Sequence, residues 1–277
     1  TRGAGFGYIG STITSLIYAS FTFIFFALEA AIMALAIELA TGLPLSIGYL
    51  LCAVVILPMV AYGITFISRL QSWTQPIWLL LLLLPYAFIA WRDPGTLQEF
   101  LRFPGYDGRG GNFNLLMFGS AVAVAASLVT QIGEQVDFLR FLPERTAANR
   151  TRWWLALVCA GPGWIVPGAA KILGGAFLAW LALSLGTPPD KAGDPTHMYL
   201  AAYTYVVSHP GLALALVTTF VVISQVKINV TNAYAGSLAW SNFFARITHS
   251  HPGRVVWLVF NVLIAVVLME MGVFGAL

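Results

Sequence analysis

Charged residues are scarce in this chain. Only 9% of its 277 residues are Asp, Glu, Lys or Arg, whereas a soluble domain carries roughly 25%. This shortage excludes an ordinary soluble enzyme and a disordered tail, and the net charge of +3 is too small for a nucleic-acid-binding protein. Cysteine is scarce too. Cys52 and Cys159 both lie within apolar runs, which excludes a disulfide framework and a cysteine zinc site.

Apolar residues make up 59% of the chain, and they gather into long runs. A helix that crosses a membrane needs about 20 mostly apolar residues. The sequence therefore predicts an all-α fold, a polytopic bundle of transmembrane helices in a cell (inner or plasma) membrane. We expect residues 1–277 to form one transmembrane domain, cut from a longer chain at both ends. The expected spans are residues 8–39, 44–67, 73–91, 114–133, 153–185, 211–244 and 255–273.

The placement of Lys and Arg predicts that the start of the chain is cytoplasmic, because cytoplasmic loops are enriched in these residues. In this orientation the outer segments hold four of them and the inner segments hold eight. The outer residues are Arg92, Arg102, Arg109 and Lys191. The inner residues are Arg2, Arg69, Arg140, Arg145, Arg150, Arg152, Arg246 and Arg254.

A few charges fall inside the expected spans, where each costs about 2.5–3.5 kcal/mol on insertion scales. They are Glu29, Lys171, Lys227 and Glu270. For Lys171 and Glu270 we favour a structural role, as an ion pair or beside a water-filled gap. For Glu29 and Lys227 we favour function. Lys227 lies in a stripe of six polar side chains between Ser224 and Asn232, and such a stripe is expected to face the protein interior.

Two expected spans carry features that disturb a regular helix. The run GSAVAVAAS at residues 119–127 is made almost wholly of small residues, which allow close approach of another helix or of a ligand. The run GPGWIVPG at residues 161–168 is expected to kink or unwind its helix. Discontinuous helices with polar groups near the bilayer midplane are typical of transporter sites.

Three stretches then resemble one known family when taken in order. They are GYIGSTITSLIYASFTFIFFALEA at residues 7–30, QIGEQVDFLRFLPERT at 131–146 and KINVTNAYAGSLAWSNFFARI at 227–247. They resemble the third, sixth and eighth helices of the nucleobase–cation symporter family, whose members are permeases for purines, cytosine, hydantoins, allantoin and related compounds. In the second stretch Asp137 and Arg140 match the family pattern, whereas Glu134 replaces its usual Asn.

The resemblance implies a LeuT-type inverted-repeat fold, of which this chain would cover about helices three to nine of twelve. It also implies that the ring of a substrate stacks on Phe25, and that Glu29 occupies a position where the family usually has an amide. The substrate-binding positions that it implies are Phe25, Glu29, Ala126, Ser127, Gln131, Asn229 and Asn232.

The resemblance also bears on ion coupling. Lys227 and Ile228 fall where sodium-coupled relatives carry a pair of hydroxyl residues that bind the ion. An ammonium group cannot bind sodium but can replace its charge. We therefore expect a protein that is not sodium-coupled, with a coupling proton carried by Lys227 or Glu29 if it pumps at all.

The leading functional prediction is a secondary active transporter for a nucleobase-like or related small heterocyclic solute. One alternative is a transporter-like sensor that binds a solute and signals to a cytoplasmic domain beyond this chain. Another is a transporter of amino acids or amines on the same fold. We do not expect the protein to be an enzyme or to bind a cofactor, a metal or nucleic acid, since the sequence carries none of the common catalytic or phosphate-binding motifs. The expected partners are the solute and the lipid bilayer.

Overall fold

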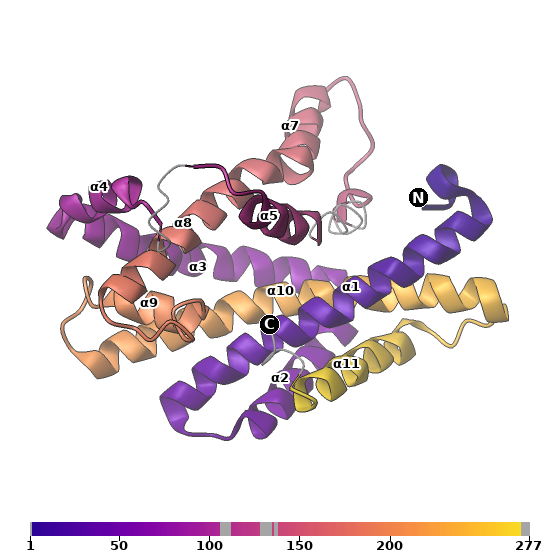
Figure 1. Ribbon diagram of the computed structural model, residues 1–277. Coiled ribbons are helices and arrows are strands. Elements are labelled where there is room, and N and C mark those ends of the chain that lie inside the picture. The colour runs from indigo at the N-terminus through magenta and orange to yellow at the C-terminus, as the bar shows by residue number, and fades with distance from the viewer. Residues whose placement is uncertain (1, 106–111, 128–134, 136–137, 273–277) are drawn as a thin grey trace. The chain divides into compact units, whose positions relative to one another are not determined.

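The computed structural model of the chain describes residues 2–105, 112–127, 135 and 138–272. These residues form helices and no strand (Figure 1), which confirms the predicted all-α class. Contacts divide the chain into two compact units. One is Gly95–Phe177, and the other combines Arg2–Pro94 with Leu178–Leu277. Each unit is described by itself below.

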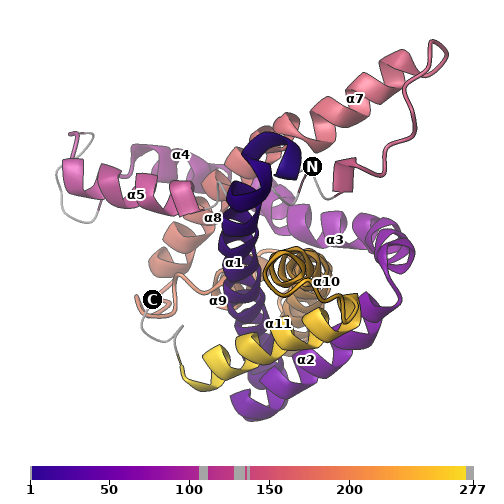
Figure 2. The same ribbon diagram turned by 90° about the vertical axis from the view of Figure 1, so that its right-hand side faces the viewer.

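The larger unit is built on a long antiparallel pair of helices, α1 (Arg2–Thr41) and α10 (Pro210–Thr248). Hydrogen bonds along the pair fix its register. They join Tyr8 to Arg246 at one end, Ser15 to Asn242 further along, and Ala36 to Thr218 near the other end. Helices α2 (Leu45–Ala61) and α11 (Arg254–Glu270) both pack along this pair (Figure 2).

Two more helices of this unit contact α10. Helix α3 (Ile64–Arg92) packs along it, and the short α9 (Pro195–Tyr203) packs against both. Asp194 caps the N-terminus of α9 by accepting a hydrogen bond from the backbone N–H of His197. At the other end of α9, the hydroxyl of Tyr203 donates to the carbonyl of Leu81 on α3 at 2.8 Å. Burial raises the pKa of Tyr203 to about 12, so this hydroxyl stays protonated as a donor at neutral pH.

Glycine and proline set the helix ends near the start of the chain. Gly42, with φ of 76°, follows the end of α1, and Pro44 precedes α2. Gly63, with φ of 89°, separates α2 from α3. As a result α2 ends at Ala61, before the expected residue 67, and α3 begins at Ile64, well before the expected residue 73. Arg254 donates to the carbonyls of Val60 and Ala61, which caps the end of α2.

Helix α10 comes close to two other helices of this unit at Gly236. A Cβ atom on Gly236 would lie 2.5 Å from Oδ1 of Asn261 on α11 and 2.6 Å from Oγ1 of Thr22 on α1. The same Oδ1 accepts a hydrogen bond from Nε1 of Trp240 at 3.0 Å. All four residues are buried. Gly236 thus allows three helices to meet around one buried amide.

The smaller unit contains α4 (Pro94–Arg102), α5 (Leu115–Ser127) and α7 (Arg150–Ala160). A 3₁₀ turn (Pro162–Trp164) then leads into α8 (Ile165–Ser184). The expected break at GPGW is therefore confirmed. Gly161 has a non-helical backbone, and a Cβ there would lie 2.7 Å from the carbonyl oxygen of Leu157. Pro167, by contrast, is accommodated within α8.

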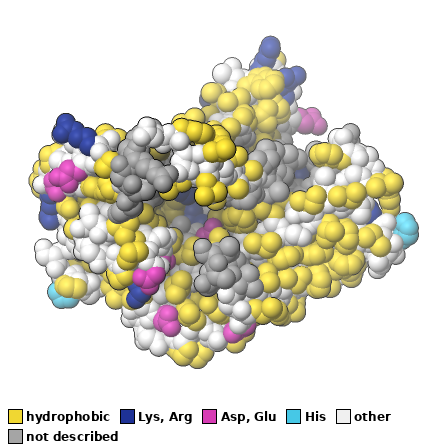
Figure 3. Space-filling view, in the orientation of Figure 1, with side chains coloured by type: hydrophobic (Ala, Val, Ile, Leu, Met, Phe, Trp, Pro, Cys, Tyr) yellow, Lys and Arg dark blue, Asp and Glu magenta, His cyan; other side chains and the backbone are white. Residues whose placement is uncertain are grey.

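In the part of the chain that the structure describes, four helices are long and apolar enough to cross a membrane. They are Gly5–Thr41, Ile64–Arg92, Pro162–Ser184 and Pro210–Thr248. The apolar helices Leu45–Ala61 and Leu115–Ala126 are shorter. Many large hydrophobic side chains lie on the outside, among them Ile9, Ile17 and Leu80. Figure 3 shows such side chains over much of the visible face, which is compatible with a membrane protein.

We expect Gly236→Ala to lower the free energy of unfolding by about 1–3 kcal/mol, because the added methyl group would force Asn261 and Thr22 apart. The measurement is unfolding of the purified full-length protein in detergent. Gly175→Ala is the matched control, since a Cβ at that helical position meets nothing within 4 Å; it should be neutral or stabilise by up to about 1 kcal/mol. A Gly236→Ala protein as stable as the control would contradict this account of the junction.

Candidate functional site

The polar stripe of α10 faces the interior of the larger unit, as expected. Gln225, Lys227, Asn229 and Asn232 are all buried. The polar residues of the stripe contact two different helices. Ser224 and Lys227 make hydrogen bonds to α3, whereas Asn229 bonds to α1. The helix therefore presents a different set of polar groups to each neighbour.

Asn229 makes the central contact between α10 and α1. Its side chain is fully buried. With the amide in the orientation that satisfies both neighbouring backbone groups, its nitrogen donates to the carbonyl oxygen of Phe26 at 3.3 Å and its oxygen accepts from the N–H of Ala30 at 3.2 Å. These two backbone groups are one turn apart and are partners in the hydrogen-bond pattern of an α-helix. One amide of α10 thus bridges one turn of α1, near the middle of both helices.

Phe25 and Glu29 lie on this same turn of α1. Both side chains are half-buried. The ring of Phe25 packs against that of Phe21, with centroids 4.3 Å apart, and against the hydrophobic cluster that contains Trp240. Glu29 follows Phe25 by one helical turn. Phe25 and Glu29 therefore lie on the turn of α1 whose backbone Asn229 contacts, at Phe26 and Ala30.

Lys227 lies two residues before Asn229, on the side of α10 that faces α3. Its side chain is only 8% exposed. Its ammonium donates to the carbonyl of Gln71 and to Oγ1 of Thr74, both at 3.1 Å, and Nε2 of Gln71 donates back to the carbonyl of Lys227 at 2.7 Å. Among the described residues no carboxylate forms an ion pair with Lys227. A buried positive charge is thus held by neutral oxygens.

The other predicted site residues make no hydrogen bond to these groups in the part of the chain that the structure describes. Asn232 is 2% exposed, and its amide nitrogen finds no hydrogen-bond partner within the described ranges. Ile228 is half-buried. Ala126 is exposed near the end of α5 in the smaller unit. Ser127 ends that helix, and Gln131 lies outside the described residues, as do Glu134 and Asp137.

The partners of Lys227 on α3 were not expected from the sequence. The expected third span began at residue 73, which left Gln71 in a loop. Gln71, Thr74 and Trp78 recur at helical spacing, and Nε1 of Trp78 bonds to Oγ of Ser224 at 3.2 Å. That spacing was the available signal for a polar face on α3 that matches the stripe on α10.

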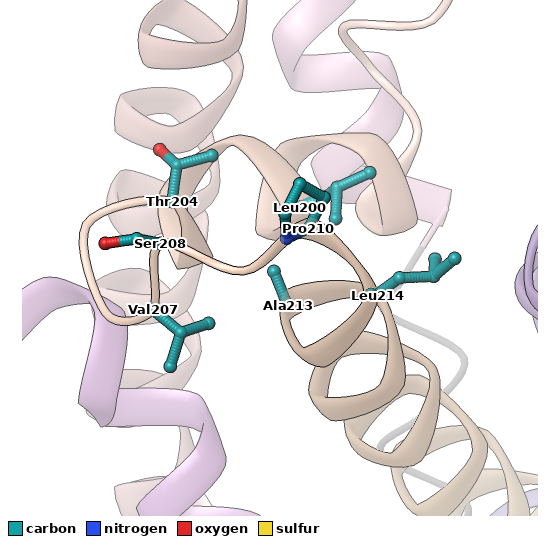
Figure 4. Close-up of a pocket in the computed structure, with 8 residues that line it drawn as sticks. Leu200, Thr204, Val207, Ser208, Pro210, Ala213 and Leu214 are labelled. Atoms are coloured by element: carbon teal, nitrogen blue, oxygen red, sulfur yellow. The ribbon is translucent and has the colours of Figure 1, made fainter.

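A pocket of about 480 Å³ lies apart from these residues, at the turn between α9 and α10. Its lining is largely apolar and contains none of the predicted site residues (Figure 4). Thr204 and Ser208 supply its side-chain hydroxyls. The lining residues are Leu200, Thr204, Val207, Ser208, Pro210, Gly211, Ala213 and Leu214.

Comparison of the chain with protein-family models, with curated proteins and with solved structures finds no match in any of the three. The functional interpretation therefore rests on the chain's own residues and contacts.

We expect Thr74→Val to lower the free energy of unfolding by about 1–3 kcal/mol, because it removes an acceptor from the buried ammonium of Lys227. The control is Thr219→Val. Thr219 makes the same bond to the carbonyl one turn back as Thr74 does, but on an exposed face, and its replacement should change stability by less than about 0.5 kcal/mol.

A double-mutant cycle identifies the cause. In a Lys227→Met background, Thr74→Val should cost no more than the Thr219→Val control. An equal cost of Thr74→Val with and without the lysine would show that Lys227 is not what Thr74 stabilises.

Proposed function

We propose that this chain is the core of a secondary active transporter, a permease for a nucleobase-like or related small heterocyclic solute that works by alternating access. The observation that carries the proposal is the bridge from Asn229 to the turn of α1 that holds Phe25 and Glu29. That turn carries an aromatic ring and a carboxyl group, and a buried amide bonds to its backbone, between helices of membrane-spanning length. These are the groups that bind a flat, polar ring.

In this proposal each group has a separate task. Phe25 offers a face on which a ring stacks, and Glu29 accepts hydrogen bonds from ring N–H or amino groups. Asn229 holds the turn of α1 in place, while the amide nitrogen of Asn232 is free of partners among the described residues and is available to a ring carbonyl. Movement of α1 against α10 would then open or close the site.

The proposed fold is the LeuT-type inverted repeat, in the membrane orientation that the Lys and Arg placement favours. Two observations support it. Polar groups lie near the middle of the long pair α1 and α10, and α7 is separated from α8 by a break at Gly161. Interrupted helices and midplane polar groups go together in such transporters.

The proposed transporter does not use sodium. The ammonium of Lys227 is already bonded to a backbone carbonyl and a hydroxyl oxygen, which are the kinds of ligand that a sodium ion would take. A second cation at this position would meet strong repulsion in a medium of low dielectric constant. The coupling ion is then a proton, and Glu29 is the group placed to carry it beside the substrate.

Uptake by the full-length protein in proteoliposomes tests this proposal. With a panel of labelled nucleobases and hydantoins, uptake should follow an inward proton gradient and stay unchanged when choline replaces sodium. Glu29→Gln should remove the dependence on pH, because the amide cannot be protonated in this range. Uptake that rises steeply with sodium at fixed pH, or an unaltered pH profile in Glu29→Gln, would contradict it.

A further inference from the structure

A basic and aromatic surface at the start of α7 is independent of the proposed transport site. We define the α7 basic surface as Arg145, Arg150, Arg152, Trp153, Trp154, Leu155 and Val158. Residues 138–154 carry four arginines but a single acid, Glu144. Among the described residues, no ion pair joins these arginines to a carboxylate. The surface therefore keeps a net positive charge that its own side chains do not neutralise.

The turn before α7 is held in a definite shape, which places Arg145. The side-chain amide of Asn149 accepts from the N–H of Thr146 at 2.8 Å and donates to the carbonyl of Glu144 at 2.9 Å. Nε1 of Trp153 donates to the carbonyl of Pro143 at 2.9 Å. The turn is thereby tied to the first residues of the helix.

Arg145 lies over two tryptophan rings as a consequence. Its guanidinium carbon is 5.8 Å from the ring centroid of Trp153 and 5.7 Å from that of Trp154. The two rings meet edge to face with centroids 5.3 Å apart. Cation–π contact holds the guanidinium at the rings and leaves its N–H groups available to an anion.

A pocket of about 380 Å³ lies beside this arrangement. It is lined by Arg150, Thr151, Trp154, Leu155 and Val158. Polar and charged groups from the first turn of α7 form one part of the wall, and apolar side chains from the next turns form the rest. Leu155 is 59% exposed and Val158 is 49% exposed. Figure 3 shows Lys and Arg side chains gathered at the end of α7 next to hydrophobic ones.

We propose that the α7 basic surface binds an anionic phospholipid of the leaflet in which α7 begins. Arg145 and Arg150 bind the phosphate, and an acyl chain lies along Leu155 and Val158. A soluble phosphate compound would satisfy the arginines but would leave the apolar wall in water, so the pairing of charge with apolar surface selects a lipid. Arginine and tryptophan at the start of an apolar helix are also typical of the membrane interface.

The test uses the full-length protein in nanodiscs that contain phosphatidylcholine with phosphatidylglycerol, and native mass spectrometry measures retained lipid. The variant Arg145→Gln/Arg150→Gln should bind phosphatidylglycerol on the order of 25-fold more weakly, because two charges near the surface are lost. Phosphatidylcholine binding should not change. Arg92→Gln/Arg102→Gln removes the same charge from elsewhere and should leave phosphatidylglycerol binding as in the wild type.

Two further arms keep the test decisive. Arg145→Lys/Arg150→Lys retains the charge, so it should keep most of the phosphatidylglycerol binding even if the glutamine variant fails to fold. Inorganic phosphate at millimolar concentration should not displace the lipid. Equal losses in the Arg92/Arg102 control, loss of binding in a folded lysine variant, or displacement by inorganic phosphate would each overturn the proposal.

Discussion

The larger unit is organised around the contact between α1 and α10. In lipid, two apolar helices gain little from hydrophobic burial against each other, so close packing at small residues and hydrogen bonds must hold them. This pair has both. Gly236 lets α10 approach Thr22 and Asn261, and Asn229 bonds to the backbone of α1 at Phe26 and Ala30. These contacts fix the register, and the register decides which side chains of α1 meet which side chains of α10.

The same register gives α10 two distinct neighbours. Towards α1 it presents Asn229, which bonds to the backbone of the turn that carries Phe25 and Glu29. Towards α3 it presents Lys227, whose ammonium is held by Gln71 and Thr74. One turn of α10 therefore joins the proposed substrate contact to a buried positive charge on its other side. Movement of α10 relative to α1 and α3 would change both, which is a physical route by which binding and movement would be coupled in the proposed transporter.

Much of this fold was predictable from composition and patterning, but only part of the site was. Long apolar runs predicted helices, and GPGW predicted the break before α8, because glycine and proline act locally. The polar stripe on α10 predicted a buried face for Lys227 and Asn229. The pairing of Lys227 with Gln71 and Thr74 was not predicted, because it depends on the register between α3 and α10. The boundary between α2 and α3 was expected between residues 67 and 73 but lies at Gly63, since an apolar run does not reveal a single residue with positive φ.

The most direct test of the central claim is ligand binding at the turn that holds Phe25. The melting temperature of the full-length protein is measured against increasing concentrations of cytosine, uracil, hypoxanthine and hydantoin. We expect one of them to stabilise the wild type and to bind Phe25→Ala about 5- to 150-fold more weakly, because about 1–3 kcal/mol of ring stacking is lost. Ile24→Ala, at a 43% exposed neighbour, should bind as the wild type does. Equal affinity in Phe25→Ala and Ile24→Ala would contradict a binding site at this contact.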